Sequence, residues 1–578
     1  ARFVVADAAP IADGQETTAR TAAAERIEGA VALVKSRIAP DRRATLERFV
    51  REYFRQVAPE DLDAREPGDL YGAALSHWNF ARRRDPGKPR VRAFNPALDE
   101  HGWQSTHTIV EIVTDDMPFL VDSVAMEINR HGLTLHLLIH PILRAVRDPN
   151  GTLDDVVVAP DGGAAQPGRR ESFIHVEVDR IADFNTSAQL AADIERVLGD
   201  VRAAVEDWPK MLARLRGVAA DVQQAPPPLA PAELAEGLAF VEWLADNHFT
   251  LLGYRCHDLV DMDGAPGLKI VPGSGLGILR ETGGTTMSES FSALPPEARS
   301  RARVPELLII TKGNSRSTVH RPGYLDYIGI KRFDPAGAVI GEHRFMGLYT
   351  STAYSSPPAT IPMLRTKVAN VVARAGVAPG SHAGKALLNI LETYPRDELF
   401  QIGEDDLLET SIGILHLGER QRFRLFVRRD AFERFVSCLI YAPRENYTTE
   451  LRRRWQSMLV EAYAGSGAEF NVFLSESVLA RILITVRTVP GRIPEVDAAD
   501  MEQRLAAAAR RWEDDLASAL IEGAGEAKGN ALLRMLGAGF PASYREDVPA
   551  RAALGDAQML ARVVTGIPAS AGPSGHRR

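Results

Sequence analysis

Glycines 273, 275 and 277 stand close together after residues with strand-like character, a spacing that suggests a phosphate-binding turn. A dinucleotide fold requires this turn to open a helix whose N-terminus holds the pyrophosphate. Here residues 278–282 run directly into another glycine turn at Gly283 and Gly284. The segment is therefore predicted to be a plain loop, without a bound cofactor.

A second glycine-containing segment, residues 380–386, superficially resembles the phosphate loop of nucleotide-hydrolysing enzymes. Its glycine spacing is one residue short, and Ala386 stands where a Ser or Thr must bind magnesium. A capping turn before a helix at residues 386–393 is the preferred interpretation.

Histidines provide the remaining candidate for a metal site. His136 and His140 share one face of a predicted strand, with His131 and His175 as possible neighbours. No cysteine accompanies them, so a structural or interface role is favoured over zinc, and no metal site is predicted. The two cysteines, Cys256 and Cys438, exclude a disulfide framework and favour a reducing compartment, with the cytoplasm as the default.

Charge and hydropathy exclude other classes of function. The 578 residues have a net charge of -8, which argues against general nucleic-acid binding despite the arginine runs 82–84 and 452–454. Such runs are usually solvated surfaces. No apolar run reaches the roughly 18 to 20 residues of a membrane-spanning helix, and residues 1–5 lack the apolar core of a secretory signal.

The first sheet-containing region is predicted to be ferredoxin-like. A strand at 106–113 is followed by a turn and a helix at 119–130, which Pro118 should open and Asp115 and Asp116 should favour electrostatically. The predicted elements that follow are strands at 133–146 and 172–178 and a helix at 186–198. This order is β-α-β-β-α, most of a ferredoxin-like unit.

Two further regions are predicted. The proline-rich residues 225–231 mark a linker, after which a helix at 232–245 precedes many strands and few helices, as in a sheet-centred sensor fold. A second α+β sandwich is predicted from the pattern of strands at 422–428, 435–442, 469–474 and 480–488, with a helix at 448–464. The fold class is thus α+β and multidomain.

Five strings resemble the N-terminal half of the large bacterial NAD-specific glutamate dehydrogenases. They occur in order along the chain: LYGAALSHWNFARRR (70–84), DDMPFLVDSV (115–124), SHAGKALLNILETYPRDELFQI (381–402), VSCLIYAPRENYTTELR (436–452) and FPASYRED (540–547). The resemblance implies ACT-type βαββαβ sandwiches, a PAS-like sheet domain and helical segments. The expected division is a helical lead-in (1–100), ACT-like domain 1 (101–224), a PAS-like domain (225–395), ACT-like domain 2 (396–492) and a helical segment with a tail (493–578).

The resemblance further implies a parent enzyme that converts L-glutamate, NAD and water to 2-oxoglutarate, ammonia and NADH. That chemistry needs a lysine in a glycine-rich pocket and a dinucleotide fold. None of the nine lysines in this sequence has a convincing setting. The active site and bound NAD are therefore expected outside this segment, beyond Arg578, and the segment alone is expected to be inactive; catalysis by the segment itself is the rival interpretation.

In ACT domains, the loop between the first strand and first helix lies at a domain interface and binds small amino-acid effectors. The matching residues are Asp115, Asp116, Pro118 and Asp122. Backbone N–H groups at the helix start would receive the effector carboxylate, and an aspartate its amino group. The ACT pattern places glycine after the proline, whereas this chain has Phe119, whose side chain would fill the effector pocket. Packing or an oligomer contact is therefore favoured over effector binding at this turn.

The leading functional hypothesis is a cytoplasmic regulatory and assembly module. Its ACT-like domains would pair across subunits of a homo-oligomer, a tetramer by family resemblance, and act on the downstream catalytic domain when a small amino acid binds. The alternative is a free-standing ACT-domain sensor or scaffold left by truncation. Neither nucleic acid nor a membrane is an expected partner.

Overall fold

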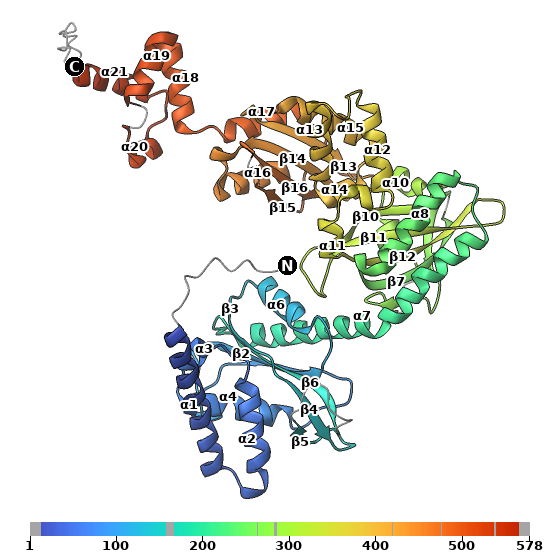
Figure 1. Ribbon diagram of the computed structural model, residues 1–578, viewed down its shortest axis with the longest axis vertical. Coiled ribbons are helices and arrows are strands. Elements are labelled where there is room, and N and C mark those ends of the chain that lie inside the picture. Colours follow the sequence, from blue (N-terminus) through green and yellow to red (C-terminus); the bar gives the residue numbers. More distant parts are fainter. Residues whose placement is uncertain are drawn as a thin grey trace. The chain divides into compact units, whose positions relative to one another are not determined.

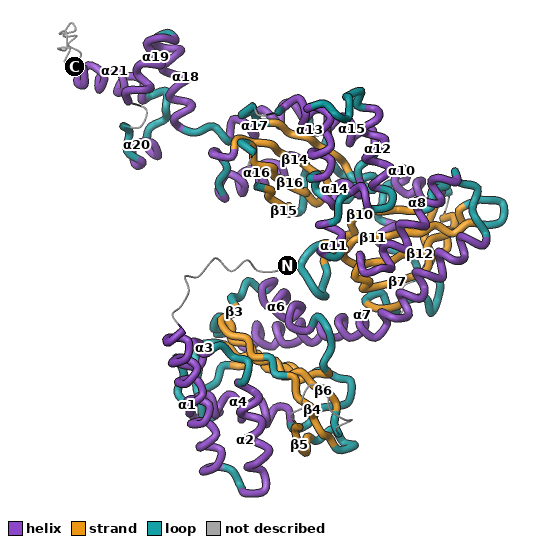
Figure 2. The backbone as a smooth tube through the Cα atoms, in the orientation of Figure 1, coloured by secondary structure: helices purple, strands orange, loops and turns teal. Residues whose placement is uncertain are grey.

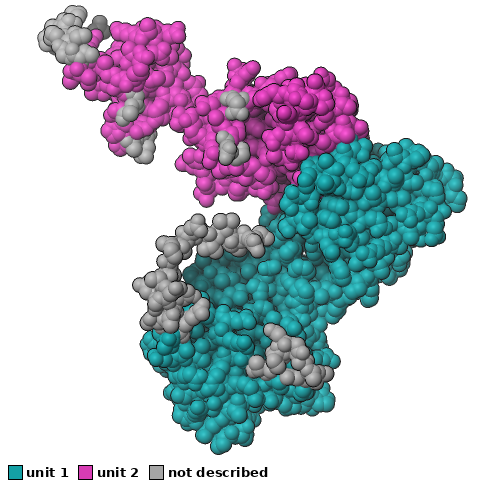
Figure 3. Space-filling view, in the orientation of Figure 1, with its two compact units in different colours: residues 1–292, 300–366 teal, residues 293–299, 367–578 magenta. Residues whose placement is uncertain are grey.

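The computed structural model describes residues 13–157, 167–262, 264–281, 286–418, 420–474, 477–536 and 539–565. These residues form helices and three antiparallel sheets, which confirms the predicted α+β multidomain class. The chain divides into two compact units, residues 1–292 with 300–366, and residues 293–299 with 367–578 (Figure 3). No described helix is long and apolar enough to cross a membrane.

The first unit begins with a helical layer beneath a six-stranded sheet (Figures 1 and 2). Three of the four helices in this layer start at prolines, whose missing N–H costs nothing in a first helical turn. Phe49 packs edge-on against Trp78 and Phe173, and thereby joins two helices to the sheet. The helices are α1 (Asp13–Arg37), α2 (Pro40–Phe54), α3 (Pro59–Asp63) and α4 (Pro67–Ala81).

The first sheet has the order β1-β2-β6-β4-β5, and β3 also pairs with β6. Its inner strand β2 is rich in β-branched residues and is buried on both faces, between the N-terminal helices and the layer of α6 and α7. The elements are β1 (Arg90–Phe94), α5 (Leu98–His101), β2 (Thr108–Asp115), α6 (Leu120–Arg130), β3 (Leu135–Ile139), β4 (Ile142–Arg147), β5 (Leu153–Val157), β6 (Arg169–Val178) and α7 (Phe184–Gln224).

Three predicted elements in this region differ from the structure. The single strand expected over 133–146 is two strands, β3 and β4, which pair with different parts of β6 on either side of Pro141. Helix α6 begins at Leu120 rather than Pro118, because Phe119 has φ +73°, outside the helical region. Helix α7 extends to Gln224, well beyond the predicted end, and Pro209 lies inside it.

The second sheet of this unit has the order β10-β11-β12-β7-β8, with β9 paired to β7. Six strands are present in this sheet, which confirms the prediction of many strands, and several short helices lie between and around them. The elements are α8 (Pro231–Trp243), η1 (Leu244–His248), β7 (Phe249–Met262), β8 (Ala265–Ile270), β9 (Leu276–Gly277), α9 (Glu289–Ser292), α10 (Pro296–Ser300), η2 (Arg301–Arg303), β10 (Leu308–Arg316), β11 (Tyr324–Phe333), β12 (Val339–Tyr349), α11 (Ser351–Ser355) and η3 (Pro358–Thr360).

The second unit is built around a four-stranded sheet of order β13-β14-β16-β15. One face of this sheet packs on α16 and α17 through Trp455, Leu459 and Leu505. The predicted strands and helix are confirmed, and Thr448 caps α16 by accepting from Leu451 N–H.

The helices and strands of this part of the chain are α12 (Leu364–Arg374), α13 (His382–Glu392), α14 (Arg396–Gln401), α15 (Glu404–Leu417), β13 (Arg424–Arg429), β14 (Phe435–Pro443), η4 (Arg444–Asn446), α16 (Thr449–Ala462), β15 (Gly467–Phe473), β16 (Leu479–Arg487), α17 (Ala498–Ala508), α18 (Trp512–Ala524), α19 (Glu526–Leu536), α20 (Ala542–Asp547) and α21 (Ala553–Thr565).

Candidate functional site

The predicted effector turn connects β2 to α6, and its first carboxylate already has strong partners. Arg84 and Arg202 bind the two oxygens of Asp115 at 2.5 and 2.7 Å. Burial raises the pKa of Asp115, but the hydrogen bonds from Arg202 and Arg84 outweigh burial and lower it. Arg84 is buried and also binds Glu171 at 2.9 Å, so Asp115 belongs to an ion-pair network beneath the turn.

The other predicted carboxylates have separate surroundings. Ser172 Oγ donates to Asp116 at 2.9 Å, and the Arg170 guanidinium lies 3.0 Å from the same carboxylate. Asp122 is 63% exposed and lies 3.7 Å from the Nδ1 atom of His320. The structure therefore groups Asp115 and Asp116 with arginines, and leaves Asp122 as the exposed acid.

Phe119 holds the backbone conformation for which glycine is the usual residue. Its φ of +73° and ψ of 0° are left-handed, a region that costs an L-residue roughly 1–2 kcal/mol. Its ring lies 4.8 Å, centroid to centroid, from that of His320, which also has a positive φ, +76°. His320 N–H donates to Ser123 Oγ at 3.0 Å, so two strained segments of the first unit support each other.

Phe119 forms part of the wall of an apolar cavity of about 310 Å³, near the lower end of the range for small-molecule sites. Pro118 lies beside it, α7 contributes Trp208, and the start of β7 contributes Phe249. None of the described residues that line the cavity is charged. A carboxylate bound there would depend on neutral donors.

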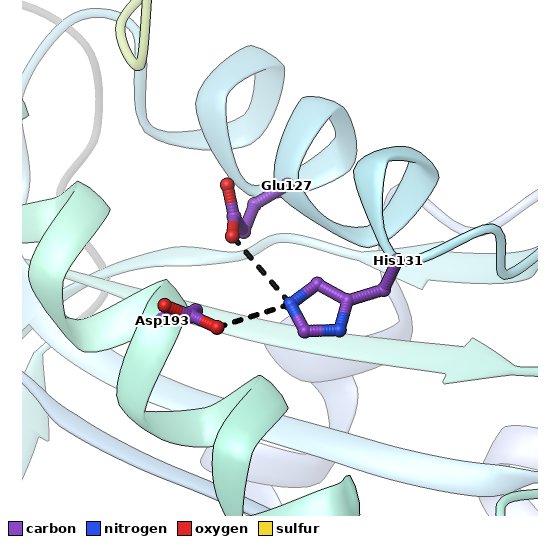
Figure 4. Close-up of side chains that lie close together, drawn as sticks. All are labelled: Glu127, His131 and Asp193. Atoms are coloured by element: carbon purple, nitrogen blue, oxygen red, sulfur yellow. Dashed lines mark ion pairs between the residues drawn. The ribbon is translucent and has the colours of Figure 1, made fainter.

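Glu127, His131 and Asp193 form a cluster between α6 and α7 (Figure 4). His131 Nε2 lies 3.6 Å from Glu127 and 3.2 Å from Asp193. The same carboxylates are approached by arginines, Arg130 on Glu127 at 2.5 Å and Arg196 on Asp193 at 3.4 Å. Two guanidinium groups already balance these acids and would repel a divalent cation, so the cluster is best explained as an ion-pair network between the two helices.

The four histidines considered from the sequence are not brought together. His136 binds Asp179 at 2.7 Å, and the His140 side chain is largely buried, which lowers its pKa. His175 contacts the rings of Tyr53 and His77 on the side of the N-terminal helices, whereas His131 pairs with α7. In the described part of the chain these residues occupy separate structural positions.

The glycine segment 273–277 supports helix α7. Gly277 N–H donates to the Asp207 carboxylate at 3.0 Å, and Arg280 Nε donates to the same carboxylate at 2.6 Å. In a nucleotide-binding loop, the corresponding backbone amide would donate to a phosphate. A Cβ at Gly277, which has φ +61°, would lie 2.1 Å from the Leu252 carbonyl oxygen. Glycine is therefore required here for close backbone packing.

The segment before α13 is a capping turn, as predicted. Ser381 Oγ accepts from Gly384 N–H at 3.0 Å, and a Cβ at Gly384 would lie 2.3 Å from Ala378 O. The cap and this close packing explain Gly384 without a bound phosphate.

Lys331, which is buried, and Lys367, which is half-buried, serve as donors to backbone carbonyls. Lys367 Nζ donates to Leu399 O at 2.9 Å and to Ile402 O at 2.8 Å, and burial lowers its pKa to about 8. Lys331 Nζ donates to Val304 O at 2.6 Å. These contacts assign both ammonium groups to loop and helix ends rather than to a substrate.

Sequence reasoning missed Asp207, Arg280 and the pairing of Phe119 with His320. Asp207 and Gly277 are 70 residues apart, and nothing in their local patterns marks them as partners. Asp207 shares a helical face with the apolar Ala204 and Met211, which is a signal that the sequence does carry.

Comparison with protein-family models identifies four segments. They are described as "Glutamate dehydrogenase, ACT1 domain" (residues 49–194), "helical motif 1" (361–420), "ACT2 domain" (424–513) and "helical motif 2" (519–563). The two ACT domains expected from the resemblance are thereby confirmed.

Three curated relatives, each named NAD-specific glutamate dehydrogenase, match most of the chain. The Halomonas elongata protein is 41% identical over 536 residues, 93% of this chain and 33% of the relative. The Pseudomonas aeruginosa protein is 39% identical over 89% of this chain and 31% of the relative. The Mycobacterium tuberculosis protein is 28% identical over 86% of this chain and 30% of the relative. The chain thus spans about a third of the length of these relatives.

Proposed function

We propose that this chain, which belongs to the family of the large bacterial NAD-specific glutamate dehydrogenases, is the regulatory and assembly part of such an enzyme. The observation that carries the proposal is the match to two ACT domains and two helical motifs within a chain that spans about a third of its relatives. Oxidation of L-glutamate to 2-oxoglutarate and ammonia, with NAD as acceptor, would take place in the portion of the enzyme that this chain does not match.

The local chemistry supports this division of roles. The described glycine segments are committed to helix docking at Gly277 and to helix capping at Gly384. The buried ammonium groups of Lys331 and Lys367 are bound to backbone carbonyls. A dehydrogenase site requires a dinucleotide turn and an available substrate lysine, and these groups already have structural partners.

Assembly is the first part of the proposed role. ACT domains commonly pair with one another, so we expect a homo-oligomer, with a tetramer as the family expectation. The exposed carboxylate of Asp122 and the apolar cavity beside Pro118 lie on the predicted effector turn. A small amino acid bound there would bias the oligomer between states, which requires different affinities for those states.

The test uses the purified 578-residue chain. Sedimentation velocity is expected to show concentration-dependent self-association, and incubation with L-glutamate and NAD is expected to produce no NADH. A panel of amino acids should raise the melting temperature for at least one member, because a ligand that binds only the folded state stabilises it. Glutamate-dependent NADH formation by this chain would refute the division of roles. A strictly monomeric chain whose melting temperature no amino acid changes would refute the regulatory and assembly role.

A further inference from the structure

The second unit contains a cavity of about 670 Å³, which is separate from the predicted effector turn. It lies between helices α13 and α15 and the face of the four-stranded sheet opposite α16 and α17. Helix α15 approaches this face closely, since a Cβ at Gly413 would lie 2.6 Å from the Phe426 ring. Helical motif 1 and the ACT2 sheet therefore line the cavity together.

Arg481 on β16 places a guanidinium in the wall of this cavity. It is paired across the sheet with Tyr441 on β14 and Phe473 on β15, so the three side chains form one row on one face. The guanidinium carbon lies 4.7 Å from the centre of the Phe473 ring, and Nη1 donates to Thr393 Oγ1 at 3.3 Å. The Nε atom of Arg481 is buried and has no hydrogen-bond partner.

An unpaired buried donor on a cation is costly, and an anion is the natural partner for it. The nearby groups do not supply one: Thr393 and Tyr441 are neutral, and burial raises the pKa of Tyr441 although Arg481 partly offsets that effect. Among the described residues lining the cavity, Arg481 is the one charged side chain. The described lining therefore places one positive charge in a partly open cavity.

The other residues that line the cavity indicate the chemistry of the part of the ligand that does not contact Arg481. Ile390, Ile414, Leu417 and Leu479 provide aliphatic surface, and Asn389 adds a neutral amide. A volume of about 670 Å³ is within the range of small-molecule sites. Apolar walls around one cation match a molecule with one carboxylate and a hydrocarbon portion.

We propose that this cavity binds a small organic carboxylate with an apolar body, held by charge-assisted hydrogen bonds from Arg481. The ligand is expected to be a carboxylic acid without an amino group, because no described lining residue provides an acid to receive an ammonium. The binding proposal is independent of the regulatory role proposed above, since it concerns only groups within the second unit.

The experiment is calorimetric titration of the 578-residue chain with 4-methylpentanoate, hexanoate and 3-phenylpropanoate, and with the uncharged isostere 4-methylpentanamide. At least one carboxylate should bind with a Kd below about 1 mM, a reachable value for a ligand of this size. The amide should bind about tenfold more weakly or not at all, because it cannot form the charged pair with Arg481. Leucine should bind more weakly than 4-methylpentanoate.

Variants separate a specific site from general effects on folding. Arg481→Gln should weaken carboxylate binding by about tenfold, and Ala386→Trp, which fills the cavity from α13, should abolish binding while leaving Arg481 in place. Arg453→Gln, at an exposed arginine of α16, is the matched control and should bind like the parent chain. The proposal is overturned if none of the three carboxylates binds, if amide and acid bind equally, if leucine binds more tightly, or if Arg481→Gln and Ala386→Trp both retain full affinity.

Discussion

Asp207 tests the role that the structure gives to the glycine segment 273–277. Its carboxylate on α7 is almost fully buried and accepts from Gly277 N–H at 3.0 Å, Arg280 Nε at 2.6 Å and Lys210 Nζ at 3.0 Å. The hydrogen bond from Arg280 is the largest effect on the pKa of Asp207, which lies well below its ordinary range. Asp207→Asn keeps the size of the side chain but removes the charge that attracts all three donors.

The expected loss follows from these contacts. Hydrogen bonds to a charged group contribute about 1.5–3 kcal/mol, and the partial exposure of Arg280 and Lys210 reduces their share. Asparagine can still accept from Gly277 N–H, so the net loss for Asp207→Asn is expected to be about 2 kcal/mol. Glu206→Gln is the matched control, because Glu206 neighbours Asp207 and binds the same Arg280 at 3.1 Å but is 47% exposed. Its expected cost is below about 0.5 kcal/mol.

Hydrogen exchange measured by mass spectrometry provides the readout, with urea unfolding of the same variants alongside it. Asp207→Asn should accelerate exchange in peptides that cover β9 and the middle of α7, whereas Glu206→Gln should leave them unchanged. Arg280→Gln combined with Asp207→Asn should cost less than the sum of the two single changes, as expected for residues in contact. Equal effects of the two acidic variants, or exchange unchanged in Asp207→Asn, would show that the segment does not depend on this carboxylate.

Three further predictions concern the buried charge, the strained turn and a cysteine. Burial raises the pKa of Glu177, but contacts with His175 and Arg65 lower it to about 2 from 4.5. Glu177 should therefore contribute about 3 kcal/mol above pH 4.5 and lose this as pH falls toward 2, and Glu177→Gln should reduce the acid-side loss of stability in urea titrations by about this amount. Phe119→Gly should be more stable than Phe119→Ala by about 0.5–1 kcal/mol, the reverse of the usual order, because glycine adopts a positive φ without strain; equal unfolding midpoints would contradict the left-handed assignment. Burial raises the pKa of Cys438, so its thiol should react with an aromatic disulfide reagent only after denaturation, and rapid reaction in the folded chain would show that it is accessible.

Local patterns were sufficient to predict most strands. The β-branched residues of the strand predicted at 106–113 describe β2, and Thr448 signals the start of α16. The start of α6 was not predictable, because Pro118 is a good first helical residue and only the φ of Phe119 shows that the helix begins later. The length of α7 was also not predicted. Helix propensity disfavours Pro209 inside a helix, but packing along the 41-residue helix contributes as well as propensity, so the helix continues through Pro209.

At the effector turn, local electrostatics did not predict the partners of Asp115. Asp115 beside a helix N-terminus suggests a site that receives an ammonium, and the sequence around it contains no nearby cation to contradict that expectation. Its actual partners, Arg84 and Arg202, are 31 and 87 residues away along the chain. Because these guanidiniums bind both carboxylate oxygens, an ammonium would have to displace a charged partner, and displacing Arg84 would leave this buried guanidinium with one acidic partner fewer. An effector at this turn is therefore expected to depend on Asp122 and the apolar cavity, and Asp122→Asn should weaken it more than any change at Asp116.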